Sequence, residues 1–268
     1  MDDFRRFEPV PAAPEGSGQP GKVTLVGAGP GPVDLLTVRA ARVLGEAQAV
    51  LYDHLVSAEV LALLGPCAQR IYVGKESACH SMPQADIIAL MLQMARAGTP
   101  LVRLKGGDSF IFGRGGEEAV ALAQAGIPFE VVPGVSAAQG AGACAGIPLT
   151  HRDHAGTLVL ATGHLRGEHE AALDWPLLAR PRQTVVFYMG VATLPTICAQ
   201  LQAHGLPGRT PAAIVERATM PGQRCITGTL DTLPALALAQ KVQAPALVIV
   251  GEVVALQPVL AQTLVPVY

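Results

Sequence analysis

The chain has 268 residues, of which 50% are hydrophobic and 15% charged, and its formal net charge at pH 7 is -2. A disordered chain would be poorer in apolar residues, and a nucleic-acid-binding chain would carry a basic surface, so both classes are excluded. The 29 glycines and 22 prolines follow no three-residue period, which excludes a collagen-like fibre. A soluble α/β protein of one large or two medium domains remains.

Residues 1–21 turn from charged to Pro- and Gly-rich and contain no apolar core segment, so we expect a flexible tail without a secretory signal. No run reaches the roughly 18 apolar residues of a membrane span. The chain contains five cysteines, namely Cys67, Cys79, Cys144, Cys198 and Cys225. Because their number is odd and none forms a C-x-x-C pair, we expect reduced thiols in the cytoplasm. Cys79 adjoins His80, but no second pair stands at zinc spacing, and no metal site is predicted.

From Val23 onward, short apolar runs alternate with segments of helical periodicity. Strands are expected at 23–26, 49–52, 70–73, 101–104 and 129–132, with helices at 36–47, 57–64, 83–97 and 117–125. This alternation is typical of a mainly parallel sheet with right-handed crossovers. We therefore expect an N-terminal α/β domain over 22–134.

The pattern changes after Pro133-Gly134, where the small residues of 135–145 are expected to form a helix that joins the two halves. Further strands are expected at 157–162, 184–188, 212–217, 223–229 and 246–250, with helices at 194–204 and 232–240. The runs on either side of 219–222 indicate an antiparallel hairpin, so strand direction in this half is mixed. A second α/β domain is predicted over 135–257, followed by a C-terminal tail at 258–268.

Four glycine-containing loops follow predicted strands, at 27–31, 106–108, 133–134 and 189–190. Ligands of parallel α/β sheets bind beyond the carboxyl ends of the strands, and glycine allows a close approach there. Four such loops at corresponding ends favour a ligand cleft over plain turns.

The first loop does not match the dinucleotide-binding fingerprint, which narrows the classes of ligand to consider. Pro32 occupies the position of the third glycine of the dinucleotide fingerprint, although Asp53 stands where a ribose-binding acid would lie. An NAD-binding module therefore stays open as an alternative. Neither a phosphate-binding P-loop nor a G-x-S-x-G nucleophile motif is found, which disfavours nucleotide hydrolysis and serine-hydrolase chemistry.

Charged side chains surround the apolar loop within 104–118. Arg114 lies between glycines, from where its guanidinium can fork onto a carboxylate or phosphate. Glu118 is expected simply to complement the N-terminus of the next helix. A second polar group at 150–154, together with Lys75, His80 and His164, would form a local positive rim. Such a rim on a protein of net charge -2 points to a small polyanionic ligand.

These motifs, in this order, resemble those of the uroporphyrinogen-III C-methyltransferases, a group of S-adenosylmethionine-dependent tetrapyrrole methyltransferases. The resemblance runs from about Val23 to Val254 and is carried by segments 26–37, 52–56, 73–75, 104–118, 133–137, 145–152, 162–164 and 188–190. It implies two α/β domains with S-adenosylmethionine between them. It also implies transfer of two methyl groups to C2 and C7 of uroporphyrinogen III, giving precorrin-2 for sirohaem, cobalamin or haem d1. A methyltransferase of the same fold that acts on a later corrin precursor or a protein residue is the alternative.

The resemblance implies site residues as well. The implied cofactor contacts are Pro30, Gly106, Gly107, Asp108, Ile111, Ser136, Ala137, Met189, Ala218 and Ala246. The implied catalytic residues are Asp53 as proton acceptor, Lys75 as proton donor, Arg114 and Glu117. The implied substrate contacts are Lys75, Arg114, Glu117, Arg152 and Met189. Asp53 could equally be a group that positions the substrate.

The chemistry of methyl transfer agrees with this assignment. Charge is dispersed in the transition state, so catalysis should come mainly from holding two reactants in line in a dry cleft. Eight substrate carboxylates suit Arg and Lys anchors, and the proton lost after methylation suits a positioned base.

Four positions depart from the family pattern. In the family pattern an acid directly follows the first Gly-Pro-Gly, whereas here Pro32 stands in that place and the acid comes two residues later, at Asp34. Ser109 replaces a proline and is expected to loosen its loop. Ser136 replaces a threonine, and Ala218 replaces a glycine. The expected partners are a small tetrapyrrole and, as the family implies, a second copy in a homodimer, with no nucleic acid and no membrane. The chain is too short to add an oxidase and chelatase half, so precorrin-2 would pass to other enzymes.

Overall fold

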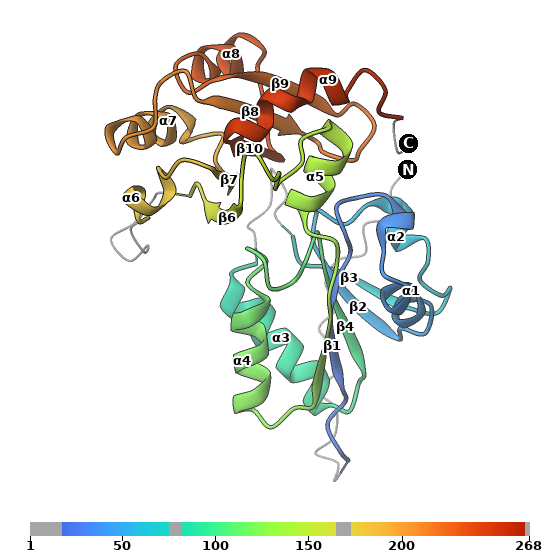
Figure 1. The fold of residues 1–268 in the computed structure, drawn as a ribbon. Helices are drawn as coiled ribbons and strands as arrows, with labels where there is room; N and C mark the ends of the chain where they lie inside the picture. Colours follow the sequence, from blue (N-terminus) through green and yellow to red (C-terminus); the bar gives the residue numbers. More distant parts are fainter. Residues whose placement is uncertain (1–17, 75–81, 165–172, 266–268) are drawn as a thin grey trace.

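The computed structural model describes residues 18–74, 82–164 and 173–265, which form two sheets with helices packed on both faces of each (Figure 1). The α/β class expected from the sequence is confirmed. Cys79 and His80 lie outside the described residues, whereas the other four cysteines are free thiols. Within the described ranges, no helix is both long and apolar enough to span a bilayer.

The first sheet is parallel throughout, with the strand order β3-β2-β4-β1-β5. Its strands are β1 (Val23–Gly27), β2 (Ala49–Tyr52), β3 (Gln69–Tyr72), β4 (Leu101–Lys105) and β5 (Phe129–Val132). The central strands β1 and β4 are buried along their whole length, as expected for strands covered on both faces. The carboxyl ends of all five strands therefore meet at one edge of this sheet.

Helices α1 (Val38–Gly45) and α2 (Ala58–Leu61) cover one face of the first sheet, and α3 (Gln84–Arg96) and α4 (Gly115–Gln124) cover the other (Figure 1). The two faces follow from the alternation of side chains along a strand. Val26 packs with α1 and α2, whereas its neighbour Leu25 packs with α3 and α4.

The starts of α1 and α4, the helices that follow the glycine loops after β1 and β4, differ from the prediction. A 3-10 turn, η1 (Val33–Leu35), precedes α1, and the Thr37 hydroxyl caps α1 by accepting from Ala40 N at 3.2 Å, so Leu36 lies before the helix. Helix α4 begins at Gly115, two residues earlier than expected, because Arg114 in a left-handed conformation (φ 59°) ends the preceding loop. The loop after β1 therefore leads into a 3-10 turn, and no helix N-terminus stands directly at 27–31 as a dinucleotide site would require.

The second sheet has the order β6-β7-β10-β8-β9, with β6 and β7 parallel and the other neighbours antiparallel. Its strands are β6 (Thr157–Thr162), β7 (Gln183–Tyr188), β8 (Pro211–Glu216), β9 (Arg224–Thr229) and β10 (Ala246–Val250). The mixed strand direction and the hairpin between β8 and β9 are both confirmed.

Helices α6 (Trp175–Leu178), α7 (Leu194–Ala203) and α8 (Leu233–Ala239) share one core with the second sheet. Helix α5 (Ala137–Ala145) and η2 (Glu252–Leu256) pack on its other face. Helix α5 follows β5 of the first sheet but is buried against the second, and it lies at the junction of the two halves in Figure 1. A short helix, α9 (Gln257–Leu260), occupies the start of the segment that we expected to be a tail.

Candidate active site

Glycine loops of the first half meet backbone to backbone at the carboxyl edge of the first sheet. Gly29 and Gly107 exchange two hydrogen bonds, with N···O distances of 3.1 and 2.7 Å. A Cβ atom on Gly134 would lie 2.3 Å from the Gly107 carbonyl oxygen, and one on Gly27 would lie 2.6 Å from Gly134 N. The loops at 27–31, 106–108 and 133–134 therefore pack so closely that no side chain fits between them. Together these loops are called the floor.

We expect Gly134→Ala to lower the free energy of unfolding by about 1–3 kcal/mol, as overpacking does. The matched control is Gly116→Ala in the first turn of α4, where an added Cβ meets nothing within 4 Å. This control should be neutral or stabilising by up to about 1 kcal/mol, since alanine costs less backbone entropy than glycine. Urea denaturation of both variants checks the prediction, and equal stability of the two would contradict it.

The Asp108 carboxylate links the loop after β4 to the loop after β5. Its Oδ2 accepts from Gly134 N at 3.0 Å, and its Oδ1 accepts from Phe110 N at 2.8 Å. The loosening expected at Ser109 is not observed, because its side chain is fully buried and its carbonyl accepts from Gly115 N at 2.9 Å. The loop from Asp108 to Arg114 is therefore held at both ends.

The middle of this loop reaches the second half. The Phe112 ring lies against that of Tyr188, at the carboxyl end of β7, with ring centroids 4.7 Å apart. Phe110, Phe112 and Met189 all expose large apolar surfaces here. Both Phe112 (φ 52°) and Met189 (φ 56°) adopt left-handed conformations that are uncommon outside glycine. Apolar side chains from both halves thus gather where the two halves meet.

The start of α5 is fastened to the carboxyl end of β7 by hydrogen bonds within the second half. Ser136 caps α5 in a capping box with Gln139, whose side chain accepts from Ser136 N at 2.9 Å. The Ser136 hydroxyl also hydrogen-bonds the Tyr188 hydroxyl, which accepts from Ala138 N at 3.1 Å. Two predicted cofactor residues, Ser136 and Ala137, therefore lie beside a third, Met189.

The hairpin between β8 and β9 provides a further contact between the two halves. Ala218 belongs to this hairpin, and its neighbour Thr219 donates from Oγ1 to the Pro30 carbonyl at 2.9 Å. Arg217 N donates to Pro245 O at 2.9 Å, which places Ala246 at the base of the same hairpin. The predicted cofactor residues of both halves thus come together around the junction, and their contact with a cofactor stays a prediction.

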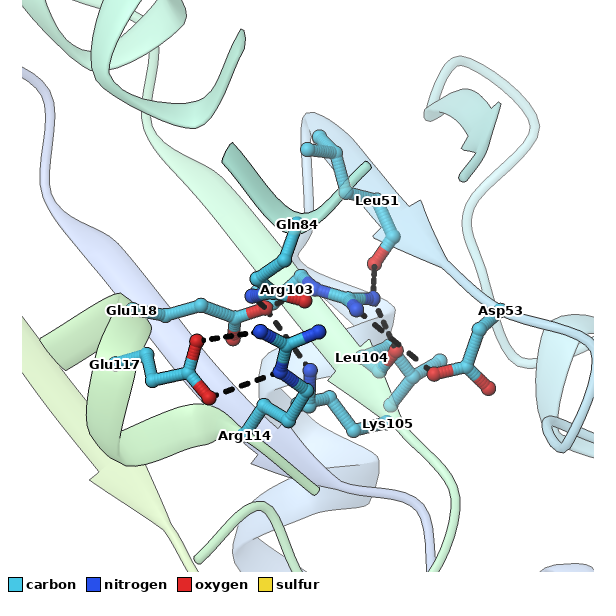
Figure 2. Close-up of polar contacts among 9 residues, drawn as sticks. All are labelled: Leu51, Asp53, Gln84, Arg103, Leu104, Lys105, Arg114, Glu117 and Glu118. Atoms are coloured by element: carbon cyan, nitrogen blue, oxygen red, sulfur yellow. Dashed lines mark hydrogen bonds and ion pairs between the residues drawn. The ribbon is translucent and has the colours of Figure 1, made fainter. Parts of the chain in front are cut away.

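A buried charged cluster underlies the floor (Figure 2). Arg103 and Lys105 lie two residues apart on β4 and so point to the same face of the sheet. Oε1 of the fully buried Glu118 accepts from Arg103 Nε at 3.1 Å, from Lys105 Nζ at 2.9 Å and from Gln84 Nε2 at 3.0 Å. Burial, reinforced by the charge of Arg103, lowers the pKa of Lys105, while Glu118 partly offsets this shift.

The expectation for Glu118 was therefore wrong. Its carboxylate does not serve the helix N-terminus but compensates two buried cations. Position 118 lies on the buried face of α4, which packs toward β4. The sequence contains a signal that points to this cluster, namely two cations inside an apolar strand, since buried charges need partners.

Asp53 lies at the edge of this cluster, directly after β2. Its Oδ1 accepts from Leu55 N at 3.0 Å, and its Oδ2 lies 3.8 Å from Nη2 of Arg103. The Asp53 side chain is 21% exposed, so one carboxylate is both anchored and open to a ligand. Leu55 packs on Gly106, where an added Cβ would lie 2.5 Å from the Leu55 Cβ. The predicted base is thus next to the predicted cofactor loop.

Arg114 and Glu117 pair with one another instead of standing apart. Arg114 Nε and Nη2 donate to the two carboxylate oxygens of Glu117, each at 2.8 Å, and the side chains are 57% and 52% exposed. This bidentate bond raises the pKa of Arg114 and lowers the pKa of Glu117. The two bonds, drawn in Figure 2, fix the orientation of a guanidinium that is more than half exposed.

The remaining predicted residues lie elsewhere. Arg152 is exposed in the turn that follows α5, where its carbonyl accepts from Arg182 Nη2 at 3.1 Å. No hydrogen bond or ion pair in the described part of the chain joins its side chain to Arg114 or Asp53. Lys75 lies outside the described residues, as does His80.

Comparisons with known proteins agree with this geometry. The sequence model of the tetrapyrrole (corrin/porphyrin) methylases matches residues 22–234. Siroheme synthase of Nitrosospira multiformis is 56% identical over 241 residues, which cover 90% of this chain and 51% of that protein. Siroheme synthase of Methylococcus capsulatus is 54% identical over 241 residues, with 90% and 51% covered. The chain thus spans about half the length of the curated relatives it matches.

Solved structures are similar over the whole fold. Native uroporphyrin III C-methyltransferase from Thermus thermophilus superposes with a TM-score of 0.73 at 43% identity, covering 88% of this chain and 99% of that one. The Thermus enzyme complexed with S-adenyl homocysteine gives 0.74 at 43% identity, with 87% and 93% covered. A cobalt precorrin-4 methyltransferase gives 0.77 at 27% identity, with 87% and 95% covered.

Proposed function

Because the chain belongs to the tetrapyrrole (corrin/porphyrin) methylase family, we propose that it is an S-adenosylmethionine-dependent uroporphyrinogen-III C-methyltransferase. It would transfer two methyl groups to C2 and C7 of uroporphyrinogen III and release precorrin-2. The observation that carries this proposal is the 43% identity with a uroporphyrin III C-methyltransferase of which 99% is covered. The precorrin-4 enzyme, which represents the later-precursor alternative, is only 27% identical.

The residues of the junction fit S-adenosylmethionine. The glycine loops leave backbone groups within reach of a ligand, since their own close packing excludes side chains from the floor. Pro30, Gly106, Gly107, Asp108, Ile111, Ser136, Ala137, Met189, Ala218 and Ala246 would hold the cofactor. When bound, the cofactor supplies an electrophilic methyl group on a sulfonium ion.

The chain's own groups would bind and orient the tetrapyrrole. Arg114 and Arg152, together with Lys75, would anchor substrate carboxylates, for which a planar guanidinium is suited. Glu117 fixes the direction of the Arg114 side chain through two hydrogen bonds. The exposed rings of Phe110 and Phe112 and the Met189 side chain would exclude water from the apolar macrocycle.

Removal of the proton that methylation leaves on the macrocycle requires a base, and Asp53 is the candidate. The hydrogen bond from Leu55 N holds one carboxylate oxygen, while the partial exposure leaves the side chain accessible. Lys75 would return a proton. The role of Asp53 is supported by its position at the carboxyl edge of the sheet, beside Gly106, whereas the role of Lys75 rests on the family resemblance.

The domain boundary, the cellular compartment and the oligomeric state are further parts of the proposal. The boundary between the two domains falls between Gly134 and Val135, which is supported by the packing of α5 on the second sheet. We propose a cytoplasmic homodimer, consistent with free thiols among the described cysteines.

Product analysis tests the proposal directly. Incubation with S-adenosylmethionine and enzymatically prepared uroporphyrinogen III, with oxygen excluded, should yield a product heavier by two methyl groups. A methylated product only from a later corrin precursor would favour the alternative substrate, and no methylated product at all would overturn the proposal. Calorimetry should show binding of S-adenosylhomocysteine and none of NAD.

A further inference from the structure

The hairpin between β8 and β9 joins the two halves through one hydroxyl group. Thr219 is fully buried, and its Oγ1 donates to the carbonyl of Pro30, 189 positions away in the sequence, at 2.9 Å. Pro30 lies in the glycine loop after β1, so this hydrogen bond links the first sheet's edge to the second sheet's hairpin.

No free space separates the segments at this point. A Cβ atom on Gly31 would lie 2.2 Å from the Met220 sulfur, and one on Gly140 of α5 would lie 2.8 Å from the Pro30 ring. The same atom on Gly140 would lie 2.9 Å from the Thr219 methyl group. Loop, helix and hairpin are therefore in direct contact, and small residues are required at their interface.

The side chain of Gln223 joins the hairpin to α5. Gln223 Oε1 accepts from Thr219 N at 2.7 Å, and Gln223 Nε2 donates to the Cys144 carbonyl of α5 at 3.0 Å. Thr219 is thus anchored to α5 through its backbone and to the Pro30 loop through its side chain. The position of the loop relative to the hairpin depends on the hydroxyl.

The backbone of Thr219 carries strain. Its φ is 68°, a left-handed value that is a genuine outlier for a β-branched residue. Arg217 in the same hairpin also has a positive φ, of 48°. Strained residues of this kind persist where the surroundings hold them, and they gather at functional sites. A glycine would remove the strain but would also remove the hydroxyl.

We propose that Thr219 is a positioning residue for S-adenosylmethionine, which sets the separation of the Pro30 loop and the Ala218 segment. These are proposed cofactor contacts from opposite halves of the molecule, and Thr219 adjoins one and hydrogen-bonds the other. The inference rests on the proposed function, because only a ligand held between the halves would respond to their separation. Thr219 acts through its neighbours and need not touch the cofactor.

Two matched variants test the role of the hydroxyl. Thr219→Val keeps the shape and loses the donor, whereas Thr219→Ser keeps the donor. Calorimetry with S-adenosylhomocysteine should show about tenfold weaker binding for Thr219→Val and a change within about twofold for Thr219→Ser. In steady-state kinetics, KM for S-adenosylmethionine should rise in Thr219→Val, while KM for uroporphyrinogen III stays within about twofold.

A third variant separates positioning from stability. Thr219→Gly relieves the backbone strain, which offsets the loss of the buried methyl and hydroxyl groups, so its Tm should stay near that of the wild type while its affinity for S-adenosylhomocysteine falls. A purely structural role predicts instead that affinity and Tm change together. If the wild type binds S-adenosylhomocysteine and Thr219→Val binds it equally well, the inference is wrong and the proposed function stands. If the wild type binds none, both are wrong.

Discussion

Replacing Glu118 by glutamine is expected to lower the free energy of unfolding by about 3–5 kcal/mol, the usual cost of leaving buried charges without a counterion. Arg103 and Lys105 both donate to Oε1 of Glu118, and all three side chains are buried. The amide of glutamine keeps the shape but carries no charge, so the two buried cations would be left with the more distant, partly exposed carboxylate of Asp53, 3.8 Å from Arg103 Nη2. Chemical denaturation of the purified variant measures the loss.

The neighbouring residue supplies the control. Glu117→Gln removes a carboxylate from the same turn of α4, where Glu117 and Arg114 are each more than half exposed. An exposed ion pair contributes about 1 kcal/mol or less, so this variant should unfold close to the wild type. Similar losses in the two variants, or a stable Glu118→Gln protein, would show that the buried cluster is not what holds β4 and α4 together.

Asp53→Asn is expected to lower kcat by about 10²–10⁴-fold, the range for loss of a general base. Asparagine retains an oxygen that can accept from Leu55 N, so the local turn should survive the substitution. The affinity for S-adenosylhomocysteine should stay within about twofold, because no cofactor contact is assigned to Asp53. Single-turnover rates together with calorimetry measure the two effects separately.

The kinetic pattern distinguishes the two roles that Asp53 could have. A raised KM with an unchanged kcat would show that the carboxylate binds or orients the tetrapyrrole and does not take its proton. Asp34→Asn serves as the control, since Asp34 is an exposed acid in the 3-10 turn after the first glycine loop. This control should leave kcat within about twofold.

Local patterns were sufficient to predict the architecture. Alternating apolar runs and helical segments gave a parallel first sheet, and the turn at 219–222 gave the β8–β9 hairpin. Both predictions depend on interactions between residues close in sequence or on the hydrophobic period of a single helix or strand. The boundaries of α1 and α4 were less accurate, because Thr37 capping and the left-handed Arg114 decide them.

The partners of individual side chains could not be predicted in the same way. Whether Glu118 faces solvent or β4 depends on how α4 packs on the first sheet, which is set by contacts with other segments of the chain such as Gln84 and Arg103. The pairing of Arg114 with Glu117 was missed because each was assigned to a ligand instead of to the other. The Thr219–Pro30 contact joins the two halves, and the Ser136–Tyr188 contact joins α5 to β7, so both exist only once segments distant in sequence are packed together.

Helix α5 depends on the second sheet for its stability. Its nine residues include Gly140 and Gly142, and a helix this short and glycine-rich is not stable in isolation. Its buried face packs on strands that come later in the chain, including Val186 of β7 and Ala213 of β8. During synthesis the glycine loops of the first sheet therefore exist before the helix that faces them. The proposed cofactor site between the halves would therefore be complete only once β10 has taken its place between β7 and β8 in the second sheet.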